Sequence, residues 1–290
     1  MKPFLKWVGG KTQLISEIKA RIPTTIQTYH EPFLGGGSVL LALLSDRAEG
    51  KRTIDVVKAS DVNAALIQLY TMVQTNVDAL IIELQKLVDA FNKLKGDNID
   101  RKPASLDDVT SPESFYYWTR AEYNKQTASA VKLSAMFLFL NKTCFRGVYR
   151  EGPSGFNVPF GHYKNPGVFD ADHLRAVSVL LDGVIFTCQP FSASLDDVKA
   201  DDFLYMDPPY VPLNATSFVG YTTDGFDIDD HRTLFAKCKT VSCNFLLSNS
   251  DVVLVTDEFP APYKIDRVSC RRAIHSKTPN ARVNEVLITN

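Results

Sequence analysis

An acid, two prolines and an aromatic residue follow one another at Asp207, Pro208, Pro209 and Tyr210. They come directly after an apolar run, residues 203–206, that is typical of a buried strand. Open α/β sheets place ligands beyond the carboxyl ends of their strands, and two prolines would fix the backbone at that point. Because neither proline has an N–H, the Pro208 carbonyl can point outward beside the Asp207 carboxylate. These oxygens would form a pair of acceptors for the two N–H donors of an exocyclic amino group.

This pair of acceptors would activate a poor nucleophile. An exocyclic nitrogen lends its lone pair to the aromatic ring, and hydrogen bonds from both of its N–H groups shift electron density back onto it. Tyr210 adds an aromatic face on which a base can stack. A sulfonium methyl donor is already activated, so in-line transfer requires positioning and electrostatics rather than a covalent enzyme intermediate. Methylation of cytosine at C5 would require a nucleophilic cysteine, and the sequence has none near Asp207.

A glycine-rich segment, Glu31–Ser38, stands between a predicted strand and a predicted helix. Gly35 and Gly37 would let a ligand approach the backbone beside a helix N-terminus. Asp61 ends the next predicted strand, where its carboxylate can accept hydrogen bonds from ribose hydroxyls. Leu40 stands where the dinucleotide fingerprint requires its third glycine, so a nucleoside without a pyrophosphate fits better than a nicotinamide dinucleotide. S-adenosylmethionine is such a nucleoside.

The sequence disfavours three other kinds of site. The segment Gly10–Thr12 resembles the end of a phosphate-binding loop, but Leu5 replaces the required glycine and no strand is predicted before it. Ser38 is not in a G-x-S-x-G elbow, so a hydrolase triad has no nucleophile there. The five cysteines form no C-x-x-C pair and the five histidines show no ligand spacing, so we expect reduced, mostly buried thiols and no metal.

Strands and helices are predicted to alternate at both ends of the chain. Near the N-terminus we expect strands over 26–30 and 54–60 with a helix over 39–45 between them. After about residue 166 the alternation returns. There we expect fully apolar, buried strands at 184–187, 203–206 and 245–248, helices at 170–181 and 229–240, and a last strand at 285–289.

The middle of the chain is predicted to be mainly helical. We expect one long helix over 63–94, a loop over 95–110, a helix opened by Ser111 and Pro112, a third helix over 128–140, and a hairpin within 144–160. The sequence therefore predicts an α/β fold, in which a doubly wound sheet is interrupted by a helical insertion of roughly residues 64–165.

The charge of the chain is balanced overall but not locally. The 290 residues, 45% of them hydrophobic, can build a sizeable core, and the net charge of −1 argues against binding nucleic acid over the whole surface. Two basic stretches, 142–164 and 267–282, could still hold phosphates and read guanine edges. Their basic residues are Lys142, Arg146, Arg150, Lys164, Arg267, Arg271, Arg272, Lys277 and Arg282. Phe145 and Tyr149 alternate with the arginines of the first stretch, as expected where a side chain fills the gap left by a displaced base.

The N-terminus is not typical of a signal peptide, because Gly9, Gly10 and Lys11 interrupt any apolar region. No apolar run reaches the ~18 residues needed to span a bilayer. We therefore expect an intracellular monomer without membrane partners, cytoplasmic and associated with the nucleoid if bacterial, or inside a host cell if viral.

Five sequence blocks occur in an order that resembles a known family: Phe4–Lys11, Glu31–Phe33 with its glycines, Ser60–Asn63, Phe156–Gly161 and Asp207–Tyr210. Over nearly the whole chain, this order resembles the Dam-type N6-adenine DNA methyltransferases of the alpha group. The resemblance implies a Rossmann-like class I methyltransferase fold with an inserted, mainly helical target-recognition domain that carries a β-hairpin.

The resemblance also implies how the chain is divided and what it does. A catalytic domain that binds S-adenosylmethionine would span 1–63 and 166–290, and a DNA-binding domain would span 64–165. The enzyme would methylate adenine N6 in double-stranded DNA by base flipping and direct in-line transfer, and would release S-adenosylhomocysteine. Such enzymes occur in restriction–modification systems.

Roles for single residues follow from the same resemblance. Cofactor contacts are implied for Trp7, Lys11, Pro32, Phe33, Gly35, Gly37, Asp61, Val62 and Asp207. Catalytic roles are implied for Asp207, Pro208, Pro209 and Tyr210. DNA contacts are implied for Lys6, Asn141, Phe145, Arg146, Val148, Arg150, Asn157, His162 and Tyr163. Among these, Phe145 corresponds to an inserted aromatic residue and Arg150 to a guanine-reading arginine.

One residue departs from the pattern of the family. Arg146 stands where relatives specific for GATC usually carry asparagine. The surrounding segment, Lys142–Gly147, looks more like enzymes that modify CATG. We therefore expect CATG slightly ahead of GATC as the target.

Three alternatives remain open from the sequence. A methyltransferase acting on RNA or on protein glutamine usually has asparagine in place of Asp207 and lacks a recognition module at this place. A catalytically inactive DNA-binding protein would not need Trp7, Asp61 and Asp207 together. A nicotinamide dehydrogenase is disfavoured by Leu40.

Overall fold

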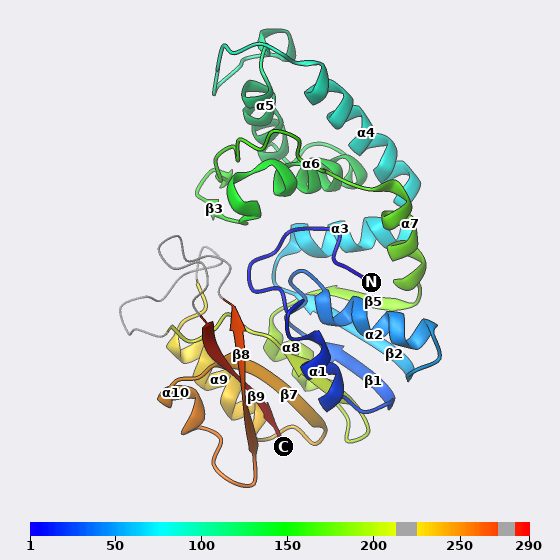
Figure 1. Ribbon diagram of the computed structural model, residues 1–290, viewed down its shortest axis with the longest axis vertical. Coiled ribbons are helices and arrows are strands. Elements are labelled where there is room, and N and C mark those ends of the chain that lie inside the picture. The colour runs from blue at the N-terminus through cyan, green and yellow to red at the C-terminus, as the bar shows by residue number, and fades with distance from the viewer. Residues whose placement is uncertain (213–224, 272–281) are drawn as a thin grey trace. The chain divides into compact units, whose positions relative to one another are not determined.

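The structure, a computed structural model, describes residues 1–212, 225–271 and 282–290. Its chain forms two compact units (Figure 1). The sheet unit contains Lys2, Lys11–Val62 and Gly183–Asn290, and the helical unit contains Met1, Pro3–Gly10 and Asn63–Asp182. The helical unit therefore includes two segments, 3–10 and 166–182, that were predicted to belong to the catalytic domain.

A seven-stranded sheet forms the centre of the sheet unit. In spatial order its strands are β5 (Val184–Cys188), β2 (Thr53–Asp61), β1 (Thr25–Glu31), β6 (Phe203–Met206), β7 (Asn244–Ser250), β9 (Arg282–Thr289) and β8 (Lys264–Arg271). The first five strands are parallel, and β9 pairs antiparallel with both β7 and β8. The predicted α/β, Rossmann-like fold class is confirmed.

The strand order places two carboxyl ends side by side at the centre of the sheet. Tyr29 of β1 pairs with Phe203 of β6, and His30 pairs with Leu204. From β1 the chain continues to β2 on one side, whereas from β6 it continues to β7 on the other side. This is the topological switch point at which open α/β sheets bind ligands. The glycine-rich turn and the tetrapeptide that begins at Asp207 both start there.

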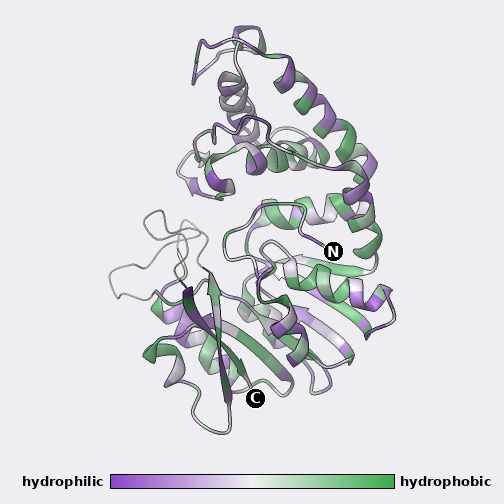
Figure 2. Cartoon of the chain, viewed as in Figure 1, coloured by the Kyte–Doolittle hydropathy of each residue, from purple (hydrophilic) through white to green (hydrophobic). Residues whose placement is uncertain are grey.

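In the described part of this unit, the helices that accompany the sheet are α1 (Ile15–Arg21), α2 (Ser38–Ala48), α8 (Phe191–Asp196), α9 (Ile228–Cys238) and α10 (Val253–Thr256). The predicted helices over 39–45 and 229–240 are confirmed as α2 and α9. The core joins β6, β7 and β9 to α9, with Met206, Phe235 and Leu247 at most 1% exposed. Figure 2 colours part of β7 as hydrophobic. A buried β6 gives the tetrapeptide a rigid base.

One expectation for the strands is wrong, and one strand was not predicted. The segment 184–187 was expected to be fully buried, but in β5 only Val184 is buried and Ile185 is 48% exposed. The reason is that β5 is an edge strand, which among the described strands pairs only with β2. Strand β8 has no clear apolar signal, because charged and apolar residues mix along it, and the sequence does not predict it.

The helical unit is built from α3 (Ala64–Thr75), α4 (Val77–Lys93), α5 (Pro112–Asn124), α6 (Ala130–Thr143) and α7 (Ala171–Leu180), with short 3-10 turns at Leu106–Asp108 and Phe145–Gly147. The expected single helix over 63–94 is wrong. Asn76 has φ −142°, which ends α3 and separates it from α4, and the two helices bend by 115°. Continuous helical periodicity in sequence does not reveal a single non-helical residue.

Caps and loops in this unit follow the sequence more closely. Ser111 caps α5 by accepting a hydrogen bond from Ser114 N, with Pro112 at the first helical position, as predicted. The expected hairpin is present as β3 (Glu151–Gly152) and β4 (Gly155–Phe156). Among the described residues, no single helix is long and apolar enough to cross a membrane, although α3 and α4 taken together pass that test by length and composition only.

Candidate active site and nucleic-acid interface

A buried ion pair joins the N-terminal lysine motif to the tetrapeptide. Lys11 Nζ lies 2.7 Å from Asp207 Oδ1, with the two side chains 6% and 19% exposed. The Lys11 backbone N–H donates to Ser38 Oγ at 3.0 Å, which fixes the lysine beside the first turn of α2. Burial raises the pKa of Asp207 and the positive charge of Lys11 opposes that rise. The pair therefore keeps a carboxylate in a largely dehydrated place.

The aromatic residue of the tetrapeptide is held from two sides. Lys11 Nζ lies 4.7 Å from the centroid of the Tyr210 ring, and Tyr210 Oη donates to Glu285 Oε2 at 2.8 Å. The next residue, Val211, donates its N–H to Asn249 Oδ1 at 3.1 Å. Of the two prolines between Asp207 and Tyr210, Pro208 is buried and Pro209 is half-buried. The tetrapeptide is thus fixed by contacts from β7 and β9 as well as by its prolines.

The glycine-rich turn folds against the end of β2. Leu34 N donates to the Ser60 carbonyl and Gly35 N donates to Asp61 Oδ2, each at 3.0 Å. Gly35 and Gly37 have backbone φ values of 47° and 62°, in a region that residues other than glycine rarely adopt. The structure therefore brings the predicted ribose acid directly to the predicted turn.

Apolar surface borders this turn. Val62, directly after Asp61, is 60% exposed. Phe33 stacks on Phe191 with ring centroids 5.4 Å apart and meets Phe226 edge-on at 5.9 Å, whereas Pro32 is buried. Sequence reasoning did not single out Phe191 or Phe226. For Phe191 the available signal was its place soon after the end of β5, at Cys188. The turn thus combines a carboxylate, backbone N–H groups and aromatic rings, which suits a nucleoside.

A second buried acid, Glu31, ends β1 at the same edge of the sheet. It is 2% exposed, and Tyr29 Oη donates to its Oε2 at 2.7 Å. Burial raises the pKa of Glu31 to about 8, and the nearby Asp207 adds to the rise. Glu31 is therefore protonated at neutral pH, so the site carries its negative charge on other acids. No role for Glu31 is predicted from the sequence.

Replacing Glu31 by glutamine is expected to change how stability depends on pH. The folded state holds a proton on Glu31 that the unfolded chain releases above about pH 4.5. The contribution of Glu31 to the free energy of unfolding is therefore complete below that pH and is lost as pH rises through about 8. Over this range the free energy of unfolding falls by at most about 1.4 kcal/mol per pH unit. In urea unfolding at several pH values, the free energy of unfolding of Glu31→Gln should increase relative to that of the wild type as pH rises. A constant difference between the two proteins would refute a proton on Glu31.

In the helical unit, the predicted DNA residue Lys6 is anchored through its backbone. The buried Asn141 side chain accepts from Lys6 N at 2.8 Å and donates to the Lys6 carbonyl at 2.7 Å. Gly147 leaves room for the Lys6 side chain, since an added Cβ would lie 2.6 Å from it. Asn141 therefore uses its amide inside the unit. Trp7, a predicted cofactor contact, also lies in this unit and stacks on Tyr149 with centroids 5.6 Å apart.

The segment before the hairpin presents an exposed aromatic residue and an arginine. Phe145 is 47% exposed, and the guanidinium of Arg146 lies 5.2 Å from its ring centroid. Arg146 has φ 58°, and its N–H donates to Tyr163 Oη at 3.0 Å. Lys6 Nζ lies 4.2 Å from the centroid of the Tyr163 ring. Tyr163 therefore contacts both residues, through a hydrogen bond from the Arg146 backbone and through its ring beside the Lys6 ammonium.

The second predicted arginine is ordered by its neighbour across the hairpin. Arg150 Nε donates to Asn157 Oδ1 at 2.6 Å, and its Nη2 donates to the Asn157 carbonyl at 3.3 Å. Both residues are exposed, and Val148 is half-buried. Of the second basic stretch, Arg272 and Lys277 lie outside the described residues, so the structure places only part of it.

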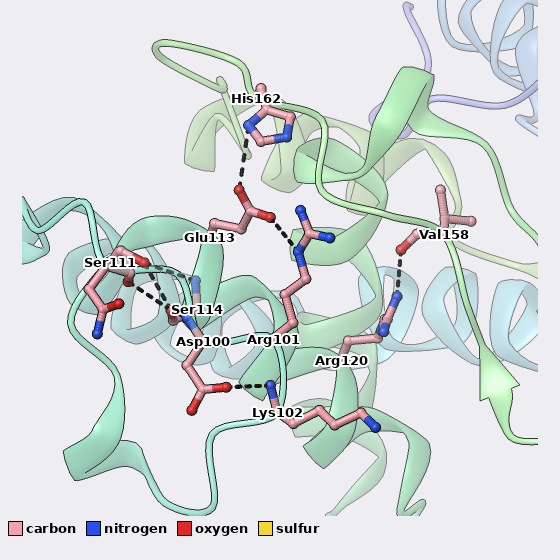
Figure 3. A network of polar contacts seen from close by, with 10 residues as sticks. Asp100, Arg101, Lys102, Ser111, Glu113, Ser114, Arg120, Val158 and His162 are labelled. Atoms are coloured by element: carbon pink, nitrogen blue, oxygen red, sulfur yellow. Dashed lines mark hydrogen bonds and ion pairs between the residues drawn. The ribbon is translucent and has the colours of Figure 1, made fainter.

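His162 belongs to a polar network around a buried acid, Glu113 (Figure 3). Glu113 lies between Arg101 Nε at 3.1 Å and His162 Nδ1 at 3.7 Å. His162 is itself exposed and has φ 53°. Arg120 donates to the Val158 carbonyl at 3.0 Å and so ties the loop after the hairpin to α5. The network fixes the loops on which His162 and Asn157 lie.

Comparisons with known proteins agree with the motifs. A family model described as D12 class N6 adenine-specific DNA methyltransferase matches residues 7–274. A type II methyltransferase of Methanocaldococcus jannaschii is 40% identical, over 100% of this chain and 99% of that protein. A DNA adenine methylase of Haemophilus influenzae is 33% identical, over 97% of this chain and 90% of that protein.

Proposed function

Because this chain belongs to the D12 class of N6 adenine-specific DNA methyltransferases, we propose that it uses S-adenosylmethionine to methylate a flipped-out adenine in a short palindrome. The observation that carries this proposal is the buried Asp207 carboxylate, 2.7 Å from Lys11, at the switch point of the sheet. Family membership favours DNA over RNA or protein glutamine and excludes a nicotinamide dehydrogenase. We assign catalysis to 1–63 and 166–290 and target recognition to 64–165, in a protein that is a monomer in solution.

The residues around the glycine turn fit the proposed cofactor. Asp61 would accept hydrogen bonds from the ribose, the exposed Val62 and the half-buried Phe33 would contact apolar parts, and the turn at Gly35 would admit the molecule beside α2. Pro32, Gly37, Lys11 and Trp7 complete the proposed set. When bound, S-adenosylmethionine supplies an activated methyl group on a sulfonium.

The tetrapeptide would orient and polarise the adenine amine. In this proposal Asp207 and the Pro208 carbonyl each accept one N–H of N6, which holds the nitrogen lone pair away from the ring. Tyr210 stacks on the base, and Pro209 keeps the backbone in place. Lys11 favours the ionised form of Asp207 by opposing the rise of its pKa. An ionised carboxylate would accept the amine N–H more strongly than a protonated carboxyl. The site would act by positioning and electrostatics, without a covalent link to the base.

DNA recognition is assigned to the exposed face formed by the hairpin and its flanks. Phe145 would fill the space left by the flipped base, while Arg146 and Arg150 would pair with guanine edges. Lys6 and His162 would contact phosphates. Val148 and Asn157 would lie against the DNA, whereas Asn141 and Tyr163 would act by holding Lys6 and Arg146 in position.

The target sequence is best tested in DNA from cells. We propose CATG ahead of GATC, because Arg146 replaces the asparagine expected for GATC. Expressed in a host without adenine methylation, the protein should produce N6-methyladenine in CATG on both strands. Methylation confined to GATC would overturn the CATG assignment but leave the enzyme class, and the absence of any N6-methyladenine would reject the function.

Replacing Arg150 by alanine should weaken discrimination at one base pair. A bidentate arginine–guanine contact contributes about 1–3 kcal/mol of specificity, and Asn157 already orders this arginine. For Arg150→Ala, kcat/KM should be measured on duplexes that each carry one substituted base pair in the site. The values for the different base pairs should become similar at one position of the site, and the preferences at the other positions should stay as in the wild type. Replacing Lys132, an exposed position elsewhere on the helical unit, by alanine is the control. An unaltered preference in Arg150→Ala would remove Arg150 from the recognition set.

A further inference from the structure

Glu285, in the last strand, is the residue that contacts the hydroxyl of Tyr210. Tyr210 Oη donates to Glu285 Oε2 at 2.8 Å. The other carboxylate oxygen, Oε1, accepts from the thiol of the buried Cys270 on β8 at 2.9 Å. Each oxygen of Glu285 thus has one donor, so the carboxylate is fixed from both sides rather than free to rotate.

The strand register brings this carboxylate to the segment that follows the tetrapeptide. Glu285 of β9 pairs with Ser250 of β7. Ser250 Oγ donates to the Val211 carbonyl at 2.6 Å, and Val211 N donates to Asn249 Oδ1. The backbone next to Tyr210 and the hydroxyl of Tyr210 are therefore both held at two adjacent register positions of the β7–β9 pair, Asn249–Val286 and Ser250–Glu285.

A phenol held in this way has a fixed ring plane. Hydrogen bonding at Oη and the fixed backbone on the other end leave the ring little freedom about its two side-chain dihedrals. Burial, Asp207 and Glu285 raise the pKa of Tyr210 well above its usual value, so the phenol stays protonated and remains the donor. A base that stacks on this ring would be oriented by the ring plane, and small errors in the position of a reacting atom slow catalysis strongly.

We propose that Glu285, supported by Cys270, is a positioning residue for methyl transfer that fixes the ring of Tyr210 for the target base. This inference rests on the proposed stacking of adenine on Tyr210. Glu285 acts through Tyr210 and need not touch the base, the cofactor or the DNA. The antiparallel pair of β8 and β9, at one edge of the sheet, then has a function in catalysis in addition to its place in the fold.

The proposal is tested by removing the same hydrogen bond from either end. Glu285→Leu and Tyr210→Phe should each lower kcat by about 10–100-fold at saturating cofactor and DNA, while the dissociation constant for S-adenosylmethionine stays within about twofold. Glu285→Gln retains an acceptor for the phenol and should keep kcat within about threefold of the wild type. The double variant Glu285→Leu/Tyr210→Phe should be no slower than the slower single variant, because both changes delete one interaction.

A fluorescent base reports the proposed effect directly. With 2-aminopurine at the target position, Glu285→Leu and Tyr210→Phe should show the same altered emission in the enzyme–DNA complex, since the base would stack on a less ordered ring. Asp266→Asn is the matched control, because Asp266 is a carboxylate on the same hairpin that pairs with Arg21. It should leave kcat and the emission unchanged.

The outcomes separate this inference from the proposed function. Wild-type kcat in Glu285→Leu, or additive losses in the double variant, would overturn the positioning role while adenine methylation by the wild type stood. If Glu285→Leu did not fold, Tyr210→Phe would still decide, because it removes the hydrogen bond and keeps the ring. A wild-type enzyme that transferred no methyl group to adenine would refute the proposed function and the positioning role together.

Discussion

Alanine in place of Asp207 is expected to lower kcat for adenine methylation on the order of 10³-fold, the scale seen when one preorganised electrostatic contact to a reacting group is removed. The carboxylate is the charged member of the acceptor pair, and the Pro208 carbonyl alone would leave one N–H of the amine unpaired. Radiolabelled methyl transfer to a duplex under single-turnover conditions measures the loss. Affinity for DNA should change little, because Asp207 makes no phosphate contact in the proposal.

Two further variants show that the loss is chemical. Lys11 is buried and would lose its partner in Asp207→Ala, so thermal unfolding must confirm a folded protein at the assay temperature. Asp207→Asn keeps one oxygen acceptor in nearly the same shape, and its kcat should lie between those of the alanine variant and the wild type. Asp196→Ala removes an exposed aspartate that pairs with Lys237 and should change nothing. Near-normal turnover in Asp207→Ala would exclude Asp207 from catalysis.

Methionine in place of Lys11 is expected to destabilise the fold and shift the pH dependence of catalysis. Removing one partner of a buried ion pair leaves the other charge uncompensated, which typically costs about 3–5 kcal/mol; the 19% exposure of Asp207 places this case at the low end. Burial already raises the pKa of Asp207, and Lys11 is the largest influence that lowers it. Without Lys11 the carboxyl would hold its proton to higher pH.

The sign of the pH effect follows from the form of Asp207 that the mechanism uses. The ionised carboxylate accepts the amine N–H, so kcat should rise with pH as Asp207 loses its proton. In Lys11→Met the rise in kcat should occur at higher pH than in the wild type. The difference in kcat between the variant and the wild type should therefore shrink as pH increases. Lys19→Met, which breaks a Lys–Asp pair with the buried Asp46, is the matched control and should leave the profile in place. A profile in Lys11→Met that coincides with the wild type would show that Lys11 does not set the charge of Asp207.

The parts of the site that sequence could predict lie close together along the chain. The apolar strand before Asp207 and the glycine turn after β1 are local patterns, and both occur where they were expected. Contacts between distant segments could not be predicted. The bond from Tyr210 to Glu285 joins positions 75 residues apart, and a lone glutamate in a predicted strand carries no sign of its partner.

The fold shows the same limit. Central strands such as β6 and β7 are buried on both faces and are recognisable as short apolar runs. Whether β5 lies at the edge or in the centre depends on strand order, which its sequence does not encode, so Ile185 was wrongly expected to be buried. The break at Asn76 depends on one residue within an otherwise helical pattern. Asn141 and Tyr163, which stay predicted DNA residues, bond to the backbone of Lys6 and of Arg146, and these long-range contacts too have no sign in the sequence.

The proposed mechanism is tested most directly by a crystal structure of the wild-type protein with S-adenosylhomocysteine and an unmethylated duplex that contains the target site. We predict an adenine outside the helix, with N6 at about 2.7–3.2 Å from both an Asp207 carboxylate oxygen and the Pro208 carbonyl oxygen, and with its ring stacked on Tyr210. An adenine whose N6 is bound by other groups, with Asp207 still turned toward Lys11 alone, would contradict the mechanism.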